Sequence, residues 1–247
     1  MAKEKKLNNA PLKEAIFELF WNIPIDNTGF PRDPNFENFA EEFKFSIKDL
    51  GFTLHKEFQN QLNLNIYPSV KHQYWKGELK WPVVQLGPGL FSFNDVAETY
   101  EWDSNYYPIL VKSLDCLFKS SREKLKIQKV SLKYINSFDL DSENDFLSFI
   151  SDGLNTAISN NFMINGKFKG MNIFQSFELS DKTITSISIQ TVTNNINQKP
   201  AIVWMIFAEK FGDIKPEDFS DWLKFAHANV SSIFYNMLSE KTYASFI

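Results

Sequence analysis

Four stretches of this sequence carry apolar residues at spacings of three and four, the pattern of a helix with one buried face. They run over residues 36–50, 106–118, 146–158 and 219–238. Segments rich in β-branched and aromatic residues lie before and between them, and these predict strands. We therefore expect an α+β fold in which helices pack on one face of an antiparallel sheet.

Residues that commonly begin or end helices support these predictions. Asn35 precedes the first stretch, and Gly51 follows it in the place where a left-handed residue often ends a helix. Ser142 and Asp145 precede the third stretch in the spacing of a capping box, with Asp in place of the usual Glu. The fourth stretch begins near Pro216 and is the longest, so we expect it to be the best buried.

The predicted strands repeat in order along the chain. They cover residues 13–22, 52–58, 62–67, 73–76 and 83–93, and then residues 129–140, 172–179, 183–193 and 201–210. Each half thus follows the order strand, helix, several strands, helix. The first helices of the two halves are offset by 110 residues (36 to 146) and the second by 113 (106 to 219).

These offsets predict an internal duplication. We expect a flexible tail over residues 1–9, a first half over 10–124 and a second half over 125–247, packed as one compact unit. The alternative is a single α+β domain whose alternation only resembles a repeat. In either case the strand at 201–208 (AIVWMIFA) is apolar on both faces, which predicts a central strand covered on both sides.

Composition and charge exclude several classes of protein. With 43% hydrophobic and 23% charged residues the chain is too apolar for disorder, and no run approaches 18 apolar residues, so we expect no membrane span. The net charge of -4 argues against a nucleic-acid partner bound through a basic surface. The charged N-terminus lacks a signal peptide's apolar stretch, and the lone Cys116 fits a reducing compartment, so we expect a cytoplasmic protein.

Motifs for metal, cofactor or covalent chemistry are missing. His55, His72 and His227 are isolated in sequence, so we predict no metal site. Gly87-Pro88-Gly89 lies between two apolar runs and predicts a hairpin turn rather than a phosphate-binding loop. Cys116 has no neighbouring His, and no serine nucleophile motif occurs. The sequence therefore predicts no cofactor and no catalytic residue.

An ordered set of segments carries a resemblance to a known family. The segments are APLKEAIFELFW (10–21), PVVQLGPGLFSFN (82–94) followed by Tyr100 and Trp102, LKYINSFDL (132–140) and HANVSSIFYNML (227–238). Together they resemble a sporadically distributed family of uncharacterised bacterial proteins, over nearly the full length of the chain. The resemblance implies a cytoplasmic bacterial protein, and its patchy inheritance implies an accessory role such as defence or a toxin–antitoxin pair. The family commonly has a basic residue where this chain has Phe20.

The order of elements also resembles the duplicated saddle of TATA-binding proteins. That likeness is architectural, because the acidic charge and polar strand faces do not reproduce a DNA-binding surface.

Three functions remain open. The leading hypothesis is a non-enzymatic protein-interaction module that binds another protein or itself through the open sheet face or the strand at 201–208. A second is a small-ligand-binding protein or enzyme with a pocket between the halves. A third is nucleic-acid binding through the lysine and aromatic segment at 71–81. The candidate binding residues are Asn94, Tyr100, Trp102, Tyr134, Asn136 and Trp204.

Overall fold

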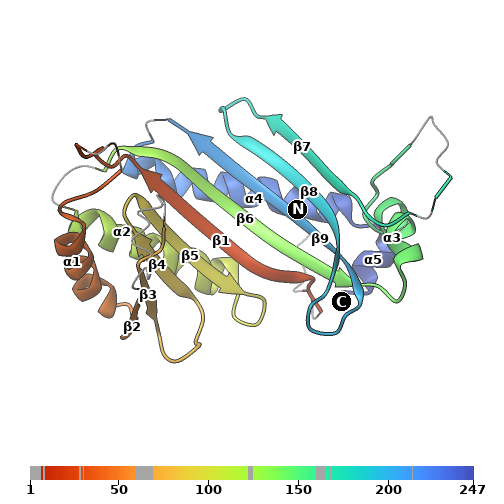
Figure 1. The fold of residues 1–247 in the computed structure, drawn as a ribbon, viewed down its shortest axis with the longest axis horizontal. Helices are drawn as coiled ribbons and strands as arrows, with labels where there is room; N and C mark the ends of the chain where they lie inside the picture. Colours follow the sequence, from red (N-terminus) through yellow and green to blue (C-terminus); the bar gives the residue numbers. More distant parts are fainter. Residues whose placement is uncertain are drawn as a thin grey trace. The chain divides into compact units, whose positions relative to one another are not determined.

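A computed structural model of the chain describes residues 7, 9–27, 29, 31–58, 69–121, 125–159, 165, 166, 168–212 and 214–247, the Asn144 side chain excepted. The strands in this described part are β1 (Leu12–Trp21), β2 (Leu54–Glu57), β3 (His72–Trp75), β4 (Val83–Gly87), β5 (Leu90–Val96), β6 (Ile127–Asp139), β7 (Asn172–Glu178), β8 (Ile184–Thr193) and β9 (Pro200–Phe211). They form one nine-stranded sheet in the order β2-β3-β4-β5-β1-β6-β9-β8-β7 (Figure 1).

Five α-helices accompany these strands among the described residues: α1 (Phe36–Lys48), α2 (Tyr107–Ser120), α3 (Phe146–Ser148), α4 (Phe219–Met237) and α5 (Glu240–Ala244). Single π-helical turns precede α2 at Trp102–Tyr106 and follow α3 at Phe149–Gly153. The predicted α+β class is confirmed. The predicted strand at 62–67 lies outside the described residues.

By contact density the chain divides into two compact units that are interleaved in sequence. Unit 1 comprises residues 1–13, 133–208 and 225–247, and unit 2 comprises residues 14–132 and 209–224. The duplication into residues 10–124 and 125–247 rests on sequence pattern, a different criterion, and stays a prediction.

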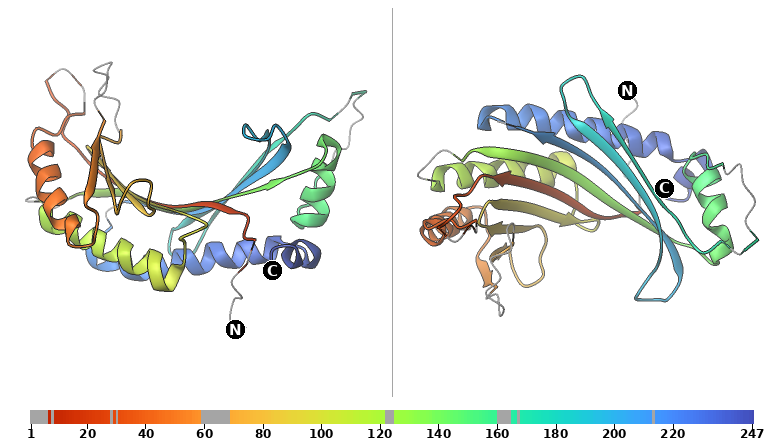
Figure 2. Two further views of the ribbon diagram at one scale, coloured as in Figure 1. Left: turned by 90° about the horizontal axis from the view of Figure 1, so that it is seen from below. Right: turned by 45° about the horizontal axis from the view of Figure 1, so that its top comes forward.

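In unit 2, helices α1 and α2 lie on one face of the strands (Figure 2). The buried ring of Phe43 on α1 meets the rings of Tyr74 and Phe91 at 5.3 and 6.2 Å, and the Tyr74 hydroxyl donates to the Ala40 carbonyl at 3.3 Å. Strand β1 buries alternate residues, because successive side chains point to opposite faces of a sheet. The buried set is Ala15, Phe17, Leu19 and Trp21.

In unit 1, α4 covers one face of the strands. The Asn229 amide on α4 donates to the Thr185 hydroxyl on β8 at 2.6 Å. At one end of the unit the Phe138 ring stacks on Phe149 at 4.8 Å and meets Phe246 edge-on at 5.9 Å. These aromatic contacts hold the π-helical turn after α3 and the C-terminal residues against β6.

Two predictions about unit 1 were wrong. The strand at 201–208 is central, between β6 and β8, but only one face is fully covered: Trp204 and its alternate neighbours are buried, whereas Val203, Met205 and Phe207 are half-buried. Being apolar on both faces therefore does not imply being covered on both faces. The third helix was predicted to reach residue 158, but its helical turns end at Gly153, and Asn155 adopts a left-handed φ of 46° that ends a helix.

Candidate functional site

Three of the candidate binding residues lie in unit 2. The Asn94 side chain is 8% exposed, and its Nδ2 donates to Oε1 of Glu14 at 2.7 Å. The rings of Tyr100 and Trp102 pack against the buried Tyr106 ring at 5.2 and 5.9 Å. Tyr100 and Trp102 therefore attach the π-helical turn to the core of the unit.

The other three lie in unit 1 and take part in its packing. The Tyr134 hydroxyl lies 2.9 Å from Nδ1 of His227, and Nδ2 of Asn136 donates to the Trp204 carbonyl at 3.4 Å. The Trp204 side chain is fully buried. All three residues are thus buried within unit 1, and their role in binding stays a prediction.

None of the candidate binding residues lies on strand β7, the last strand of the sheet among the described residues. All of its residues except Ile173 are exposed; Phe174 is 63% and Phe177 is 52% exposed. The strand reads NIFQSFE, so Glu178 is its only charged residue. Natural sheets commonly protect an edge with lysine, proline, a bulge or a very short strand. Strand β7 has seven residues and neither lysine nor proline.

Backbone hydrogen bonds show which groups of β7 point outward. The Thr191 N–H donates to the Met171 carbonyl at 3.1 Å, and the Leu179 N–H donates to the Thr183 carbonyl at 2.8 Å. In an antiparallel pair the N–H and C=O of one residue point to the same side, and the side alternates along the strand. Odd-numbered residues of β7 therefore bond to β8. The even-numbered residues, from Asn172 to Glu178, direct their backbone groups to the open edge.

The opposite edge of the sheet differs. Strand β2 has four residues, and its exposed side chains are the charged Lys56 and Glu57. A short edge strand with charged side chains resists pairing with another chain. Among the strands that the structure describes, the two edges are therefore unequally protected, and β7 is the less protected one.

Beside this edge lies a partly apolar sheet face. The Phe174 ring meets Phe207 of β9 at 6.3 Å, and Nζ of Lys133 lies 5.9 Å from the centre of the Phe207 ring. The hydroxyls of Ser176 and Ser186 are 2.8 Å apart. These contacts hold β7 in register with its neighbours, so the exposed edge belongs to an ordered strand.

The Phe20 ring on β1 has a cation beside it. Nζ of Lys129 lies 5.4 Å from the centre of the Phe20 ring and 5.5 Å from that of Phe211. The same ammonium is 2.5 Å from Oε1 of Glu209. Lys129 of β6 thus contacts the Phe20 ring and pairs with Glu209.

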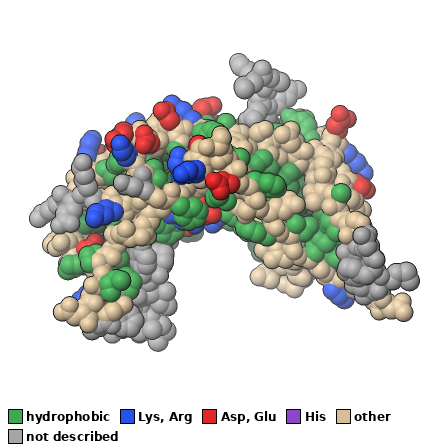
Figure 3. Space-filling view, turned by 90° about the horizontal axis from the view of Figure 1, so that it is seen from above, with side chains coloured by type: hydrophobic (Ala, Val, Ile, Leu, Met, Phe, Trp, Pro, Cys, Tyr) green, Lys and Arg blue, Asp and Glu red, His purple; other side chains and the backbone are tan. Residues whose placement is uncertain are grey.

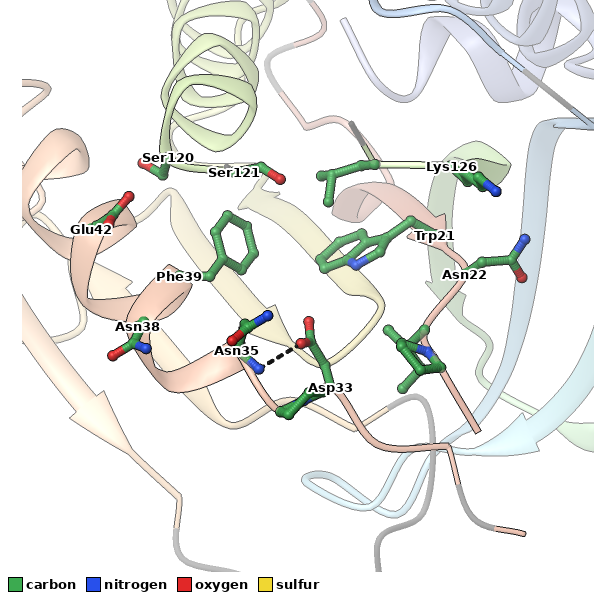
Figure 4. Close-up of a pocket in the computed structure, with 14 residues that line it drawn as sticks. Trp21, Asn22, Asp33, Asn35, Asn38, Phe39, Glu42, Ser120, Ser121 and Lys126 are labelled. Carbon is green, nitrogen blue, oxygen red and sulfur yellow. Dashed lines mark hydrogen bonds between the residues drawn. The ribbon is translucent and has the colours of Figure 1, made fainter. Parts of the chain in front are cut away.

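Unit 2 also contains a cavity of about 600 Å³ between β1, the start of α1 and the end of α2 (Figure 4). Phe39 and Trp21 meet edge-on at 6.1 Å, and Asp33 accepts a hydrogen bond of 2.9 Å from the Asn35 N–H. Glu42 and Lys126 also line the cavity. A smaller cavity of about 420 Å³ lies between α2 and the start of α4. None of the six candidate binding residues lines either cavity.

Surface charge and the segment at 71–81 bear on nucleic-acid binding. On the face shown in Figure 3, basic and acidic side chains are interspersed rather than gathered by sign. Tyr74 is 1% and Trp75 is 6% exposed, so these rings are not accessible for stacking on bases. Both observations disfavour this alternative.

Within the described part of the chain, no three His, Cys, Asp or Glu side chains are grouped so that they could hold a metal ion. No described helix is both long and apolar enough to cross a membrane. No protein-family model matches the sequence, and no curated protein matches it. The resemblance to the sporadically distributed bacterial family therefore stays a prediction.

Proposed function

We propose that this protein is a non-enzymatic interaction module that binds its partner by adding a strand to β7. The observation that carries the proposal is an exposed, nearly uncharged edge strand, whose even-numbered residues direct their backbone groups away from β8. Main-chain hydrogen bonds along such an edge supply affinity, and alternate side chains supply specificity. Phe174 and Phe177, on opposite faces of β7, are the exposed aromatic side chains that a paired strand would cover.

A proline substitution that removes only an outward-pointing N–H of β7 tests the proposal. Ser176→Pro removes an outward donor and leaves the odd-numbered bonds to β8, and edge strands tolerate proline at such positions. Affinity purification of the tagged full chain from its host, followed by quantitative mass spectrometry, measures partners kept and lost. We expect the amount of the specific partner recovered with Ser176→Pro to be at least tenfold lower than with the native chain.

Two variants serve as matched controls. Ser176→Ala removes the hydroxyl contact with Ser186 but keeps the N–H, so it retains the partner. Glu57→Pro makes the same change on the opposite edge: the Phe58 N–H donates to the Lys71 carbonyl, so the neighbouring Glu57 N–H points outward. If Glu57→Pro and Ser176→Pro lose the same partner to the same extent, binding does not depend on β7 and the proposal is wrong.

We also propose that the chain contains two similar halves with the TATA-binding-protein order of elements. The strand order supports this: the first strand of each half, β1 or β6, neighbours the last, β5 or β9, and the intervening strands follow outward. Each half also places one helical segment after its first strand and another after its last. Expression of residues 125–247 alone tests it, because an autonomous second half gives a cooperative unfolding transition.

A second function, binding of a small ligand, is favoured by the 600 Å³ cavity of unit 2. Two carboxylates, Asp33 and Glu42, line it with one lysine, so a cationic or hydroxyl-rich ligand fits better than an anion. Thermal-shift screening with polyamines and sugars tests this. Glu42→Gln should abolish any shift, whereas Glu41→Gln, a neighbour paired with Lys44, should not.

A further inference from the structure

We infer that the partner strand at β7 is β7 of a second copy of this chain, paired antiparallel about a two-fold axis at Gln175. This inference rests on the proposed strand addition and names its partner. Closed two-fold dimers are the commonest protein oligomers, and in them one surface must complement itself. The question is therefore whether β7 can pair with itself without conflict.

Backbone geometry restricts the register. The even-numbered residues carry the outward groups, so even-numbered residues must face one another in hydrogen-bonded pairs. Gln175 is the midpoint of Asn172–Glu178, so an axis there pairs all seven residues of the strand. Phe174 then faces Ser176 of the second copy, and Asn172 faces Glu178. Any other axis leaves part of the strand unpaired.

Side chains are complementary in this register. On one face, Ile173 lies opposite Phe177 of the second copy on both sides of the axis, with the two Gln175 amides between them. These are non-hydrogen-bonded positions, where facing Cα atoms are about 4.5 Å apart and side chains are closest. On the other face, the Asn172 amide can donate to the Glu178 carboxylate. Each exposed aromatic ring thus gains a neighbour.

Charge is compatible with the same arrangement. Glu178 is the only charged residue of β7, and the axis at Gln175 places the two copies of it at opposite ends of the paired strands. They are then about 20 Å apart, at about 3.4 Å per residue. That distance is about 2.5 times the Debye length at physiological ionic strength, so their repulsion is screened.

Disulfide trapping tests both the partner and the register. In a Cys116→Ser background, Gln175→Cys places two thiols at facing non-hydrogen-bonded positions, where the Cα separation suits a disulfide. We expect mild oxidation to convert most of the full-length protein into a covalent dimer on non-reducing gels. Glu178→Cys is the matched control on the same strand, and its two thiols, about 20 Å apart, should remain unlinked.

Sedimentation of the unmodified chain supplies the second measurement. We expect a dimer at tens of micromolar that Ser176→Pro converts to monomer, while Glu57→Pro stays dimeric. Equal cross-linking of Gln175→Cys and Glu178→Cys, or cross-linking of Glu178→Cys alone, overturns the register. If the native chain is monomeric, the inference that the partner is a second copy is wrong. The proposed function then stands only if Ser176→Pro still loses a different bound protein.

Discussion

Nε2 of His55 lies 3.0 Å from Nδ1 of His72, so one imidazole donates a hydrogen bond to the other. The two rings stack at 5.2 Å, and His72 also stacks on Phe36 of α1 at 5.7 Å. Burial lowers the pKa of both imidazoles; the positive charge of Lys44 lowers that of His55 further, and His55 lowers that of His72. Residues 17 positions apart in sequence thus form one neutral pair in unit 2.

We expect this pair to make the stability of unit 2 depend on pH. A histidine whose pKa is lower in the folded protein takes up protons more readily in the unfolded chain. Its contribution to folding stability is therefore complete above pH about 6.5 and is lost as the pH falls toward the folded pKa. Glu37, 3.8 Å from Nε2 of His72, opposes this effect only in part. The free energy of unfolding, measured in urea at pH 7.5 and 5.5, should fall less between these two pH values for His72→Gln than for the native chain. An equal loss in both proteins contradicts this prediction.

The third histidine, His227 in unit 1, is also neutral. Burial lowers the pKa of His227 to about 4, so at pH 7 its Nδ1 can accept a hydrogen bond from the Tyr134 hydroxyl at 2.9 Å. Tyr134→Phe removes this donor and should destabilise the protein by about 1 kcal/mol at pH 7. Tyr243→Phe is the control, since that hydroxyl makes no hydrogen bond with a described residue. Equal midpoints for the two variants in chemical denaturation would show that the Tyr134 bond contributes nothing.

Two phenylalanines on α1 provide a matched test of the core. Phe43 is fully buried, whereas Phe45, two residues on, is 65% exposed. Phe43→Ala leaves a cavity between α1 and the sheet and should destabilise the protein by about 3 to 5 kcal/mol. Phe45→Ala should change stability by about 0.5 kcal/mol or less. Guanidinium unfolding measures both, and similar losses would mean that α1 is packed differently.

Gly87 occupies a position that admits no side chain. A Cβ there would lie 1.8 Å from the Ser69 carbonyl oxygen, so the backbone around Ser69 would have to move. Gly87→Ala should therefore destabilise unit 2 by about 1 to 3 kcal/mol. Gly77→Ala is the control, because its nearest neighbour is the flexible Lys80 side chain. If a thermal scan gives Gly87→Ala the same melting temperature as the native protein, the close approach of Gly87 to Ser69 is refuted.

Most individual elements could be predicted because their signals are local. The helix expected at 36–50 is α1 at Phe36–Lys48, and Gly51 has the left-handed φ that its position suggested. The hairpin turn at Gly87-Pro88-Gly89 joins β4 to β5, and Gly89 has a φ of 72°. The third helix was overestimated, because its apolar spacing continues beyond the residues that end it.

The candidate site was harder to predict. The composition of β7 is visible in the sequence, but nothing local shows that this strand lies at the edge of the sheet. Asn94, Tyr134 and Asn136 are candidate binding residues, and the structure places each in a hydrogen bond with its own unit. A polar residue in a strand signals a buried hydrogen bond as readily as a ligand contact.

The sequence by itself determined the periodicity of each segment and the residues that each strand or helix can bury, because these depend on neighbours a few positions away. Only the tertiary structure decided the order of the strands, the meeting of His55 with His72 and the outward direction of the backbone of Ser176. These features depend on pairings between segments far apart in the chain. Their free energy comes from the packing of whole elements, which no local pattern encodes.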